Sequence, residues 1–211
     1  MNEDITYLMA MSCVLPAGIG LYRYNRMPGK YHPFIYMMLL TAVVETIFYI
    51  ALKFAALNLL SRLVVNIYML LNFSLFLYFV YINNYISKRV LQWLLGIAGL
   101  VCLVNFIYLH TFLKAFYYLL YYVSAVMLII SIDILSRQIM VIKEKLINNF
   151  WAWFSSFSIL YNAFTLLIFS QLVVVDPTKE NVHPIANIHH FVNLICYVFL
   201  AVTILKIPEK K

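Results

Sequence analysis

This sequence has little of what water-soluble domains need. Charged residues make up 11% of its 211 residues, whereas soluble domains carry about 25%. Glycine (5), proline (6) and cysteine (3) are also scarce, and the three cysteines lie inside apolar runs. Disulfide frameworks occur in loop-rich, oxidising contexts, so we do not expect one here. With 65% hydrophobic residues, the chain resembles neither a disordered segment nor a soluble globular domain.

Motifs of catalysis are missing as well. The sequence contains no G-x-S-x-G, no H-E-x-x-H, no phosphate-binding loop and no paired carboxylates. His189 and His190 are adjacent, so on a helix they point about 100° apart and cannot easily share one metal ion. We therefore expect no enzyme activity, no metal and no cofactor.

The chain consists mostly of long apolar runs. A helix needs roughly 20 residues to cross about 30 Å of hydrocarbon. Seven runs approach or reach this length, which predicts an all-α integral membrane bundle that occupies residues 1–211 as one domain. The expected spans are 5–22, 34–52, 63–82, 90–109, 112–132, 150–175 and 184–205.

Basic residues are unevenly distributed between the two sides of this arrangement. Of the 15 Lys and Arg residues, eleven follow the first, third, fifth and seventh spans, and four lie on the other side. Cytoplasmic loops are enriched in Lys and Arg, so we expect an external N-terminus and a cytoplasmic C-terminus in an inner (plasma) membrane. The lipid bilayer is thus the expected partner of the net charge of +7, and no nucleic acid is needed to explain it.

One carboxylate is predicted deep in the membrane. Glu45 lies twelve residues into the second span, where a charge is costly, so we expect it to face the bundle interior in its neutral form. Asn72 and Asn162 fall at a similar predicted depth, which suggests a three-helix polar cluster. Two interpretations are open: a neutral glutamic acid that ties helices together, or a ligand or proton site.

Other polar residues recur at helical spacing within the spans. Ser155, Ser158, Asn162 and Thr165 share one face, because their steps are 3, 4 and 3. Such faces form either a polar cavity that opens outward or a hydrogen-bonded helix interface without a cavity. If the cavity exists, the expected ligand-binding residues are Glu45, Tyr68, Asn72, Tyr117, Tyr121, Ser158, Asn162, His190 and Asn193.

Two further pairs have structural interpretations. Gly96 and Gly99 are three residues apart in the fourth span, a spacing that permits close approach of a neighbouring helix. Asp133 and Arg137 are four residues apart at the inner end of the fifth span and should form an ion pair.

The C-terminal part resembles a group of known proteins. The segments FWAWFSSFSILYNAF and IANIHHFVNLICYVFLAV are similar to those of uncharacterised bacterial seven-helix membrane proteins, which resemble the membrane sensor parts of histidine kinases. The matching positions are Phe150, Trp151, Ile188, His189 and Asn193. The resemblance implies a sensory role and a signalling partner such as a histidine kinase, without naming a ligand.

Three functions follow as hypotheses. The first is a sensory or accessory signalling protein that binds a small or lipid-like ligand in an outward-facing cavity and acts through a partner protein. The second is a small-solute transporter with Glu45 as its coupling or substrate site. The third, an intramembrane enzyme, would require His189 or His190 to meet Glu45 although their depths differ by roughly 10 Å.

Overall fold

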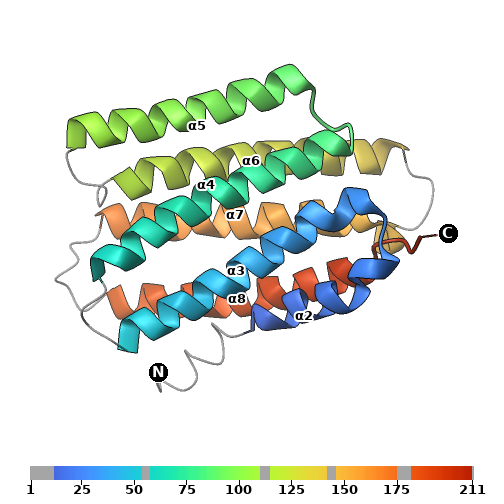
Figure 1. Cartoon of the computed structure of the whole chain (residues 1–211), viewed down its shortest axis with the longest axis horizontal. Coiled ribbons are helices and arrows are strands. Elements are labelled where there is room, and N and C mark those ends of the chain that lie inside the picture. The colour runs from blue at the N-terminus through green and yellow to red at the C-terminus, as the bar shows by residue number, and fades with distance from the viewer. Residues whose placement is uncertain (1–11, 54–57, 110–114, 142–145, 175–181, 211) are drawn as a thin grey trace. The chain divides into compact units, whose positions relative to one another are not determined.

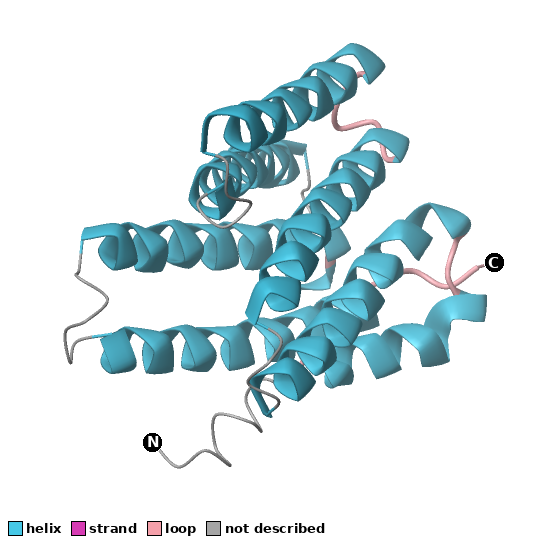
Figure 2. Ribbon diagram, turned by 60° about the vertical axis from the view of Figure 1, so that its left-hand side comes forward, coloured by secondary structure: helices cyan, strands magenta, loops and turns pink. Residues whose placement is uncertain are grey.

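The computed structural model describes residues 12–53, 58–109, 115–141, 146–174 and 182–210, and every regular element in these ranges is helical (Figures 1 and 2). The predicted all-α class is therefore confirmed. The α-helices are α2 (Val14–Arg23), α3 (His32–Lys53), α4 (Asn58–Ile82), α5 (Lys88–Leu109), α6 (Ala115–Val141), α7 (Phe150–Val174) and α8 (Val182–Leu205). Short 3₁₀ turns are η1 (Tyr24–Arg26), η2 (Gly29–Tyr31) and η4 (Leu146–Asn148).

The chain forms two compact units. Unit 1 comprises Met1–Arg23 and Ser124–Pro208, and unit 2 comprises Tyr24–Val123 and Glu209–Lys211. The boundary at Val123 and Ser124 falls inside α6, so this helix contributes to both units. Each unit has its own core and is described separately.

Unit 1 is built on the pair α7 and α8, which run side by side in opposite directions (Figure 1). The Trp153 ring near the start of α7 lies 4.8 Å from the Phe199 ring near the end of α8. Asn149 caps the start of α7, because its Oδ1 accepts hydrogen bonds from the backbone N–H groups of Trp151 (2.7 Å) and Ala152 (3.3 Å).

Helix α2 packs on α8, and one arginine fixes their C-terminal ends together. Arg23 donates from Nη1 to the carbonyl of Ile204 (2.8 Å) and from Nη2 to that of Ile207 (3.0 Å). These carbonyls lie at and just beyond the C-terminus of α8, where backbone acceptors lack partners within the helix. A guanidinium there satisfies two acceptors and also suits the negative end of the helix dipole.

Unit 2 is built on the antiparallel pair α3 and α4. Phe34 at the start of α3 stacks on Phe79 near the end of α4, with ring centroids 5.7 Å apart, and both rings are fully buried. Asn83 Nδ2, just after α4, donates to the carbonyl of Lys30, just before α3 (3.3 Å). The beginning of α3 and the end of α4 therefore lie at the same end of unit 2.

The turn from α4 to α5 has a residue in the left-handed conformation. Asn84 has φ 63°; its N–H bonds to the carbonyl of Tyr81 (2.9 Å), and the N–H of Tyr85 bonds to that of Val80 (3.1 Å). This is the Schellman pattern that closes helix C-termini, with asparagine in the position most often taken by glycine. Ser87 then begins α5, since its Oγ accepts from the N–H of Val90 (3.3 Å).

Two helical segments in the described part of the chain are long and apolar enough to cross a membrane: Tyr118–Met140 and Phe150–Ile168. Most of the residues in both segments are not buried inside the protein. Shorter apolar helical segments are Asn66–Ile82 and Phe191–Leu205. Whether all seven helices cross a membrane stays a prediction.

Several helices also present apolar faces outward. On α5, Val90, Trp93, Ile97, Leu100 and Val104 are all exposed, with steps of 3, 4, 3 and 4 that place them on one face. On α8, the exposed residues Phe191, Ile195 and Val198 follow the same spacing.

The predicted role of the α5 glycines is wrong for the described chain. A Cβ added at Gly96 or Gly99 would meet no described heavy atom within 4 Å outside its immediate chain surroundings. Both glycines belong to an open surface of α5, so they do not mediate close packing against another described helix. The Asp133–Arg137 ion pair, by contrast, is confirmed at 2.7 Å.

Candidate functional site

Unit 1 contains a row of buried hydroxyl and amide groups. At its centre, Ser131 Oγ of α6 is hydrogen-bonded to Ser158 Oγ of α7 at 2.7 Å. Asn162, one turn further along α7, donates from Nδ2 to the carbonyl of Ser158 (2.8 Å) and to its Oγ (3.2 Å). All three side chains are buried, and together they link α6 to α7 through neutral polar groups.

Further buried polar residues extend this row along the three helices. They are Ser124 on α6, Ser155 and Thr165 on α7, and Asn193 and Thr203 on α8. Thr165 and Thr203 donate to carbonyls one turn earlier in their own helices. Ser155 differs, because its fully buried Oγ has no hydrogen-bond partner in the described structure. A buried hydroxyl without a partner is costly, so this position is suited to a polar group from outside the chain.

The ring pair of Trp153 and Phe199 sets the level of α8 against α7. In an antiparallel pair, each step along α7 is matched by a step backward along α8. Counting from the ring contact puts Asn193 of α8 at a level between Ser158 and Asn162, about one residue from that of Ser158. Three of the predicted ligand-binding residues therefore lie in one buried layer of unit 1. The fourth on these helices, His190, has a side chain outside the described residues.

Unit 2 holds other predicted residues, around a bond between α3 and α4. Tyr68 Oη lies 3.0 Å from Thr41 Oγ1, whose own proton goes to the carbonyl of Met37 (2.9 Å). The Tyr68 hydroxyl is therefore the donor to Thr41. Asn72, one turn beyond Tyr68, has a buried Oδ1 without a hydrogen-bond partner among the described residues.

The register of this bond separates Glu45 from Asn72. Glu45 lies four residues beyond Thr41 on α3, and Asn72 lies four residues beyond Tyr68 on α4. Because the two helices are antiparallel, these steps lead in opposite directions, and the two residues differ by about 12 Å in level. The half-buried Glu45 side chain and Asn72 therefore do not share the level that the sequence suggested.

The two predicted tyrosines on α6 contribute less. Tyr121 is half-buried in unit 2, while the side chain of Tyr117 lies outside the described residues. Their neighbour Tyr122 makes a contact between helices, donating to the carbonyl of Leu94 on α5 (2.8 Å). Tyr122 also packs edge-on against Phe73 of α4, with ring centroids 5.9 Å apart.

The chemistry available in these layers is neutral hydrogen bonding. Serine, threonine, asparagine and tyrosine supply donors and acceptors without charge. The described chain contains no group of three His, Cys, Asp or Glu side chains that could hold a metal ion. The arrangement can therefore tie helices together or recognise a neutral polar group.

Two residues that complete these layers were missed in the sequence. Ser131 and Thr41 are the partners of Ser158 and Tyr68, yet neither stood out. A signal was present in both cases: Ser131 lies seven residues after Ser124, and Thr41 lies four residues before Glu45. Each therefore shares a helix face with another polar residue inside an apolar run.

A second polar region lies at the end of unit 2 where α3 and α5 begin. Tyr24 of η1 stacks on His32, with ring centroids 4.0 Å apart, and its hydroxyl is hydrogen-bonded to that of Tyr36 on α3. This hydrogen bond is the main reason that the pKa of Tyr24 is raised above its ordinary value of 10.0, with partial burial adding to the effect. This three-ring arrangement was not predicted from the sequence.

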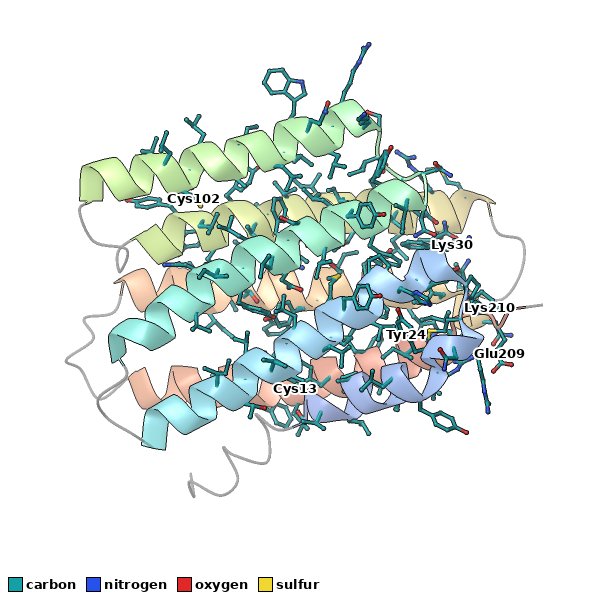
Figure 3. The ribbon with its side chains drawn as sticks, in the orientation of Figure 1. Cys13, Tyr24, Lys30, Cys102, Glu209 and Lys210 are labelled. Carbon is teal, nitrogen blue, oxygen red and sulfur yellow. The ribbon has the colours of Figure 1, made fainter. Side chains whose placement is uncertain are left out.

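Several cations lie at the same end of unit 2 as these three rings. Arg26, Lys30 and Lys210 are exposed, and the backbone N–H of Lys210 bonds to the carbonyl of Arg26 (2.8 Å), so the C-terminal residues lie against η1. Figure 3 shows Tyr24, Lys30, Glu209 and Lys210 at the same end of unit 2. Lys88 and Arg89 begin α5 at that end as well. The end therefore carries five described cations and one described carboxylate.

Comparison of the chain with protein-family models, with curated proteins and with solved structures finds no match in any of the three. The function must therefore be argued from the chain itself.

Proposed function

We propose that the chain is a multi-pass membrane protein of a bacterial inner membrane. It has a sensory or accessory signalling role, binds a small or lipid-like ligand in the outward-facing half of its helices, and acts through a partner protein such as a histidine kinase. The observation that carries the membrane part is that α5 and α8 expose apolar faces while a row of serine, threonine and asparagine side chains is buried in unit 1.

This distribution suits lipid as the solvent. A water-soluble helical bundle places its polar residues outward and its apolar residues inward. Large contiguous apolar faces on a soluble protein also favour aggregation. In hydrocarbon the same faces cost nothing, while buried hydroxyl and amide groups hold helices together.

The positions of the cations support the orientation. Within unit 1, Arg23 and Lys206 both lie at the end where α8 terminates, and Lys206 Nζ is 3.4 Å from Asn148 Oδ1 before α7. Within unit 2, Arg26, Lys30 and Lys210 lie at the end where α3 begins. Cytoplasmic loops are enriched in Lys and Arg, so both of these ends are assigned to the cytoplasm.

Cysteine labelling tests the orientation. Lys30→Cys, Lys88→Cys and Lys206→Cys should react with a membrane-impermeant maleimide in inverted vesicles and not in intact spheroplasts. The unchanged protein is the control for background, since Cys13 and Cys196 are buried and Cys102 is half-buried. Labelling of any of the three introduced cysteines from the outside would contradict the orientation, and release of the protein by alkaline carbonate would contradict the membrane assignment.

The ligand is proposed to bind at the layer of Asn193, Ser158 and Asn162, next to the unpartnered Ser155 hydroxyl. Mass spectrometry of molecules extracted from the purified protein tests this idea. A small or lipid-like compound should be retained by the native chain and lost from Asn193→Leu, while the exposed-site control Asn25→Leu keeps it. Equal retention by both variants would exclude this layer as the site.

The signalling role and transport are separated by two measurements. Co-purification from membranes should recover a membrane or cytoplasmic partner; recovery of none would count against signalling. A transporter would instead move solute across reconstituted vesicles, with flux abolished by Glu45→Gln while the protein still folds. Glu45-dependent flux would replace the sensory proposal with the transport hypothesis.

A further inference from the structure

The rings and cations at the end of unit 2 form a defined group, here called the tyrosine–cation cluster: Tyr24, Arg26, Lys30, His32, Tyr36 and Lys210. None of these residues belongs to the ligand layer proposed above. The backbone of the cluster is anchored, because Met27 and Tyr31, which lie between its members in the chain, are buried. The two 3₁₀ turns therefore present Arg26 and Lys30 from an anchored backbone.

We propose that the tyrosine–cation cluster binds the phosphate of an anionic phospholipid. This inference rests on the proposed membrane location, and it adds a lipid site that the membrane location alone does not require. Guanidinium and ammonium groups are the usual protein partners of phosphate oxygens. Here Arg26, Lys30 and Lys210 converge from two separate parts of the chain, since the backbone bond from Lys210 to Arg26 holds the C-terminal residues beside η1.

The aromatic rings indicate lipid in preference to an acidic protein. Tyr36 is 43% exposed and Trp93 is 73% exposed, and both lie one to two turns from the cationic end of unit 2. Beyond them, α3 exposes Val43 and Ile47, and α5 exposes Ile97 and Leu100. Along each helix, starting from its N-terminus, cations are followed by an exposed aromatic ring and then by exposed aliphatic residues. Phosphate groups, the interface and the acyl chains follow one another in the same order in a bilayer. An acidic protein in the cytoplasm would meet only the cations.

The three rings give the cluster a shape that scattered cations lack. Tyr24 covers His32 face to face, and its hydroxyl is held by Tyr36. The Nε2 atom of His32 is buried and has no hydrogen-bond partner in the described chain. These contacts hold the Tyr24 ring in place between His32 and Tyr36, two residues before Arg26 in the chain. Glu209, the residue directly before Lys210, is the one described carboxylate at this end, and its charge opposes anion binding.

A pair of matched variants separates a site from diffuse attraction. Each Lys or Arg near an anionic surface contributes about 1 kcal/mol, which is about fivefold in affinity. Diffuse attraction therefore predicts the same loss, about 25-fold, for Arg26→Gln with Lys30→Gln as for Lys88→Gln with Arg89→Gln. Both double variants remove two exposed cations from the same end of unit 2.

The experiment uses the full chain, purified in detergent and mixed with phosphatidylcholine and phosphatidylglycerol. Native mass spectrometry then counts the phosphatidylglycerol retained per chain. The proposal expects at least a tenfold loss for Arg26→Gln with Lys30→Gln and less than a threefold loss for Lys88→Gln with Arg89→Gln. Equal losses, or no enrichment of phosphatidylglycerol by the native chain, would overturn it.

Ring variants give a second readout that leaves the charge unchanged. Tyr24→Leu should lower phosphatidylglycerol retention by about threefold, whereas Tyr78→Leu, which removes an exposed ring from α4, should leave it unchanged. If the two variants lower phosphatidylglycerol retention equally, Tyr24 is not part of the binding site. Binding of a polyglutamate peptide that exceeds phosphatidylglycerol binding, and that the Arg26 and Lys30 changes abolish, would assign the cluster to an acidic protein instead.

Failure of this inference is distinguishable from failure of the proposed function. If the chain stays in carbonate-washed membranes while the matched variants behave alike, the membrane assignment stands and the lipid site falls. If the chain is released by carbonate, both fall together.

Discussion

The hydroxyl groups of Ser131 and Ser158 are hydrogen-bonded to each other at 2.7 Å in the buried layer between α6 and α7. Each is almost completely buried, so water cannot replace a lost partner. The bond also fixes the level of one helix against the other, because serine side chains are too short to reach a partner after a shift of one turn.

A double-mutant cycle measures this bond. Ser131→Ala and Ser158→Ala should each lower the free energy of unfolding by about 1 kcal/mol, with a coupling between them of about 0.6 kcal/mol, as for helix-to-helix hydrogen bonds in membrane proteins. Unfolding in mixed micelles gives the values. Ser170→Ala, whose exposed hydroxyl bonds within its own helix, serves as the control and should change stability little. Zero coupling would show that the two serines stabilise the protein independently.

Arg23 should be the most sensitive cation in unit 1. Arg23→Gln removes two charge-assisted hydrogen bonds to carbonyls at the end of α8, and such bonds contribute about 1.5–3 kcal/mol each to stability. Since Arg23 is half-buried, we expect the lower end of that range in total. Thermal unfolding in detergent measures the change.

The control for Arg23 is a cation at the N-terminal end of a helix, whereas Arg23 binds at the C-terminal end of α8. Arg89 lies in the first turn of α5, where a positive charge opposes the helix dipole, so Arg89→Gln should be neutral or slightly stabilising. Equal losses from both changes would mean that net charge, and not the two carbonyl contacts, accounts for the effect of Arg23.

Gly96→Ala and Gly99→Ala should stabilise α5. Added Cβ atoms would meet no described neighbour, and alanine favours the helix over glycine by up to about 1 kcal/mol at each position. The midpoint of thermal unfolding should therefore rise with each change. Destabilisation, or a change in oligomeric state on size-exclusion chromatography, would show that another chain packs against this face.

Tyr24 should titrate above the ordinary tyrosine range. Its hydrogen bond to Tyr36 favours the neutral phenol, so Tyr36→Phe should move the midpoint of Tyr24 down toward 10.0. Carbon-13 NMR of labelled tyrosine, assigned with Tyr24→Phe, follows the titration. A midpoint that does not respond to Tyr36→Phe would contradict the hydrogen bond.

The same pKa predicts how stability depends on pH. The folded state holds the Tyr24 proton more tightly than the unfolded state, so its contribution is complete below pH 10. It is lost as the pH rises through the raised folded pKa. The native protein should therefore lose more stability than Tyr24→Phe as the pH rises above 10.

The fold class could be predicted from the sequence because helix-length apolar runs specify helices by local physics. The Asp133–Arg137 pair and the shared face of Ser158 and Asn162 were also predictable, since both depend only on spacing within one helix. The pairing of Thr41 with Tyr68 and of Ser131 with Ser158 was not, because each pair joins two helices. Which levels meet depends on turn geometry and helix register, and neither is encoded in a single periodic pattern.

The glycines of α5 also show that spacing within one helix does not predict packing between helices. A spacing of three residues states only that Gly96 and Gly99 lie on one face. Whether another helix covers that face depends on the packing of the whole unit, and in the described chain the face is open.

The left-handed backbone at Asn84 limits which residues can replace asparagine at this position. Glycine adopts this left-handed conformation without strain, and aspartate or histidine adopts it at a small cost. Valine or isoleucine would be strained there, so the end of α4 would have to change. Any homologue that keeps the same reversal into α5 should draw its residue from that short set. Position 84 is therefore expected to tolerate fewer residue types than the apolar positions around it.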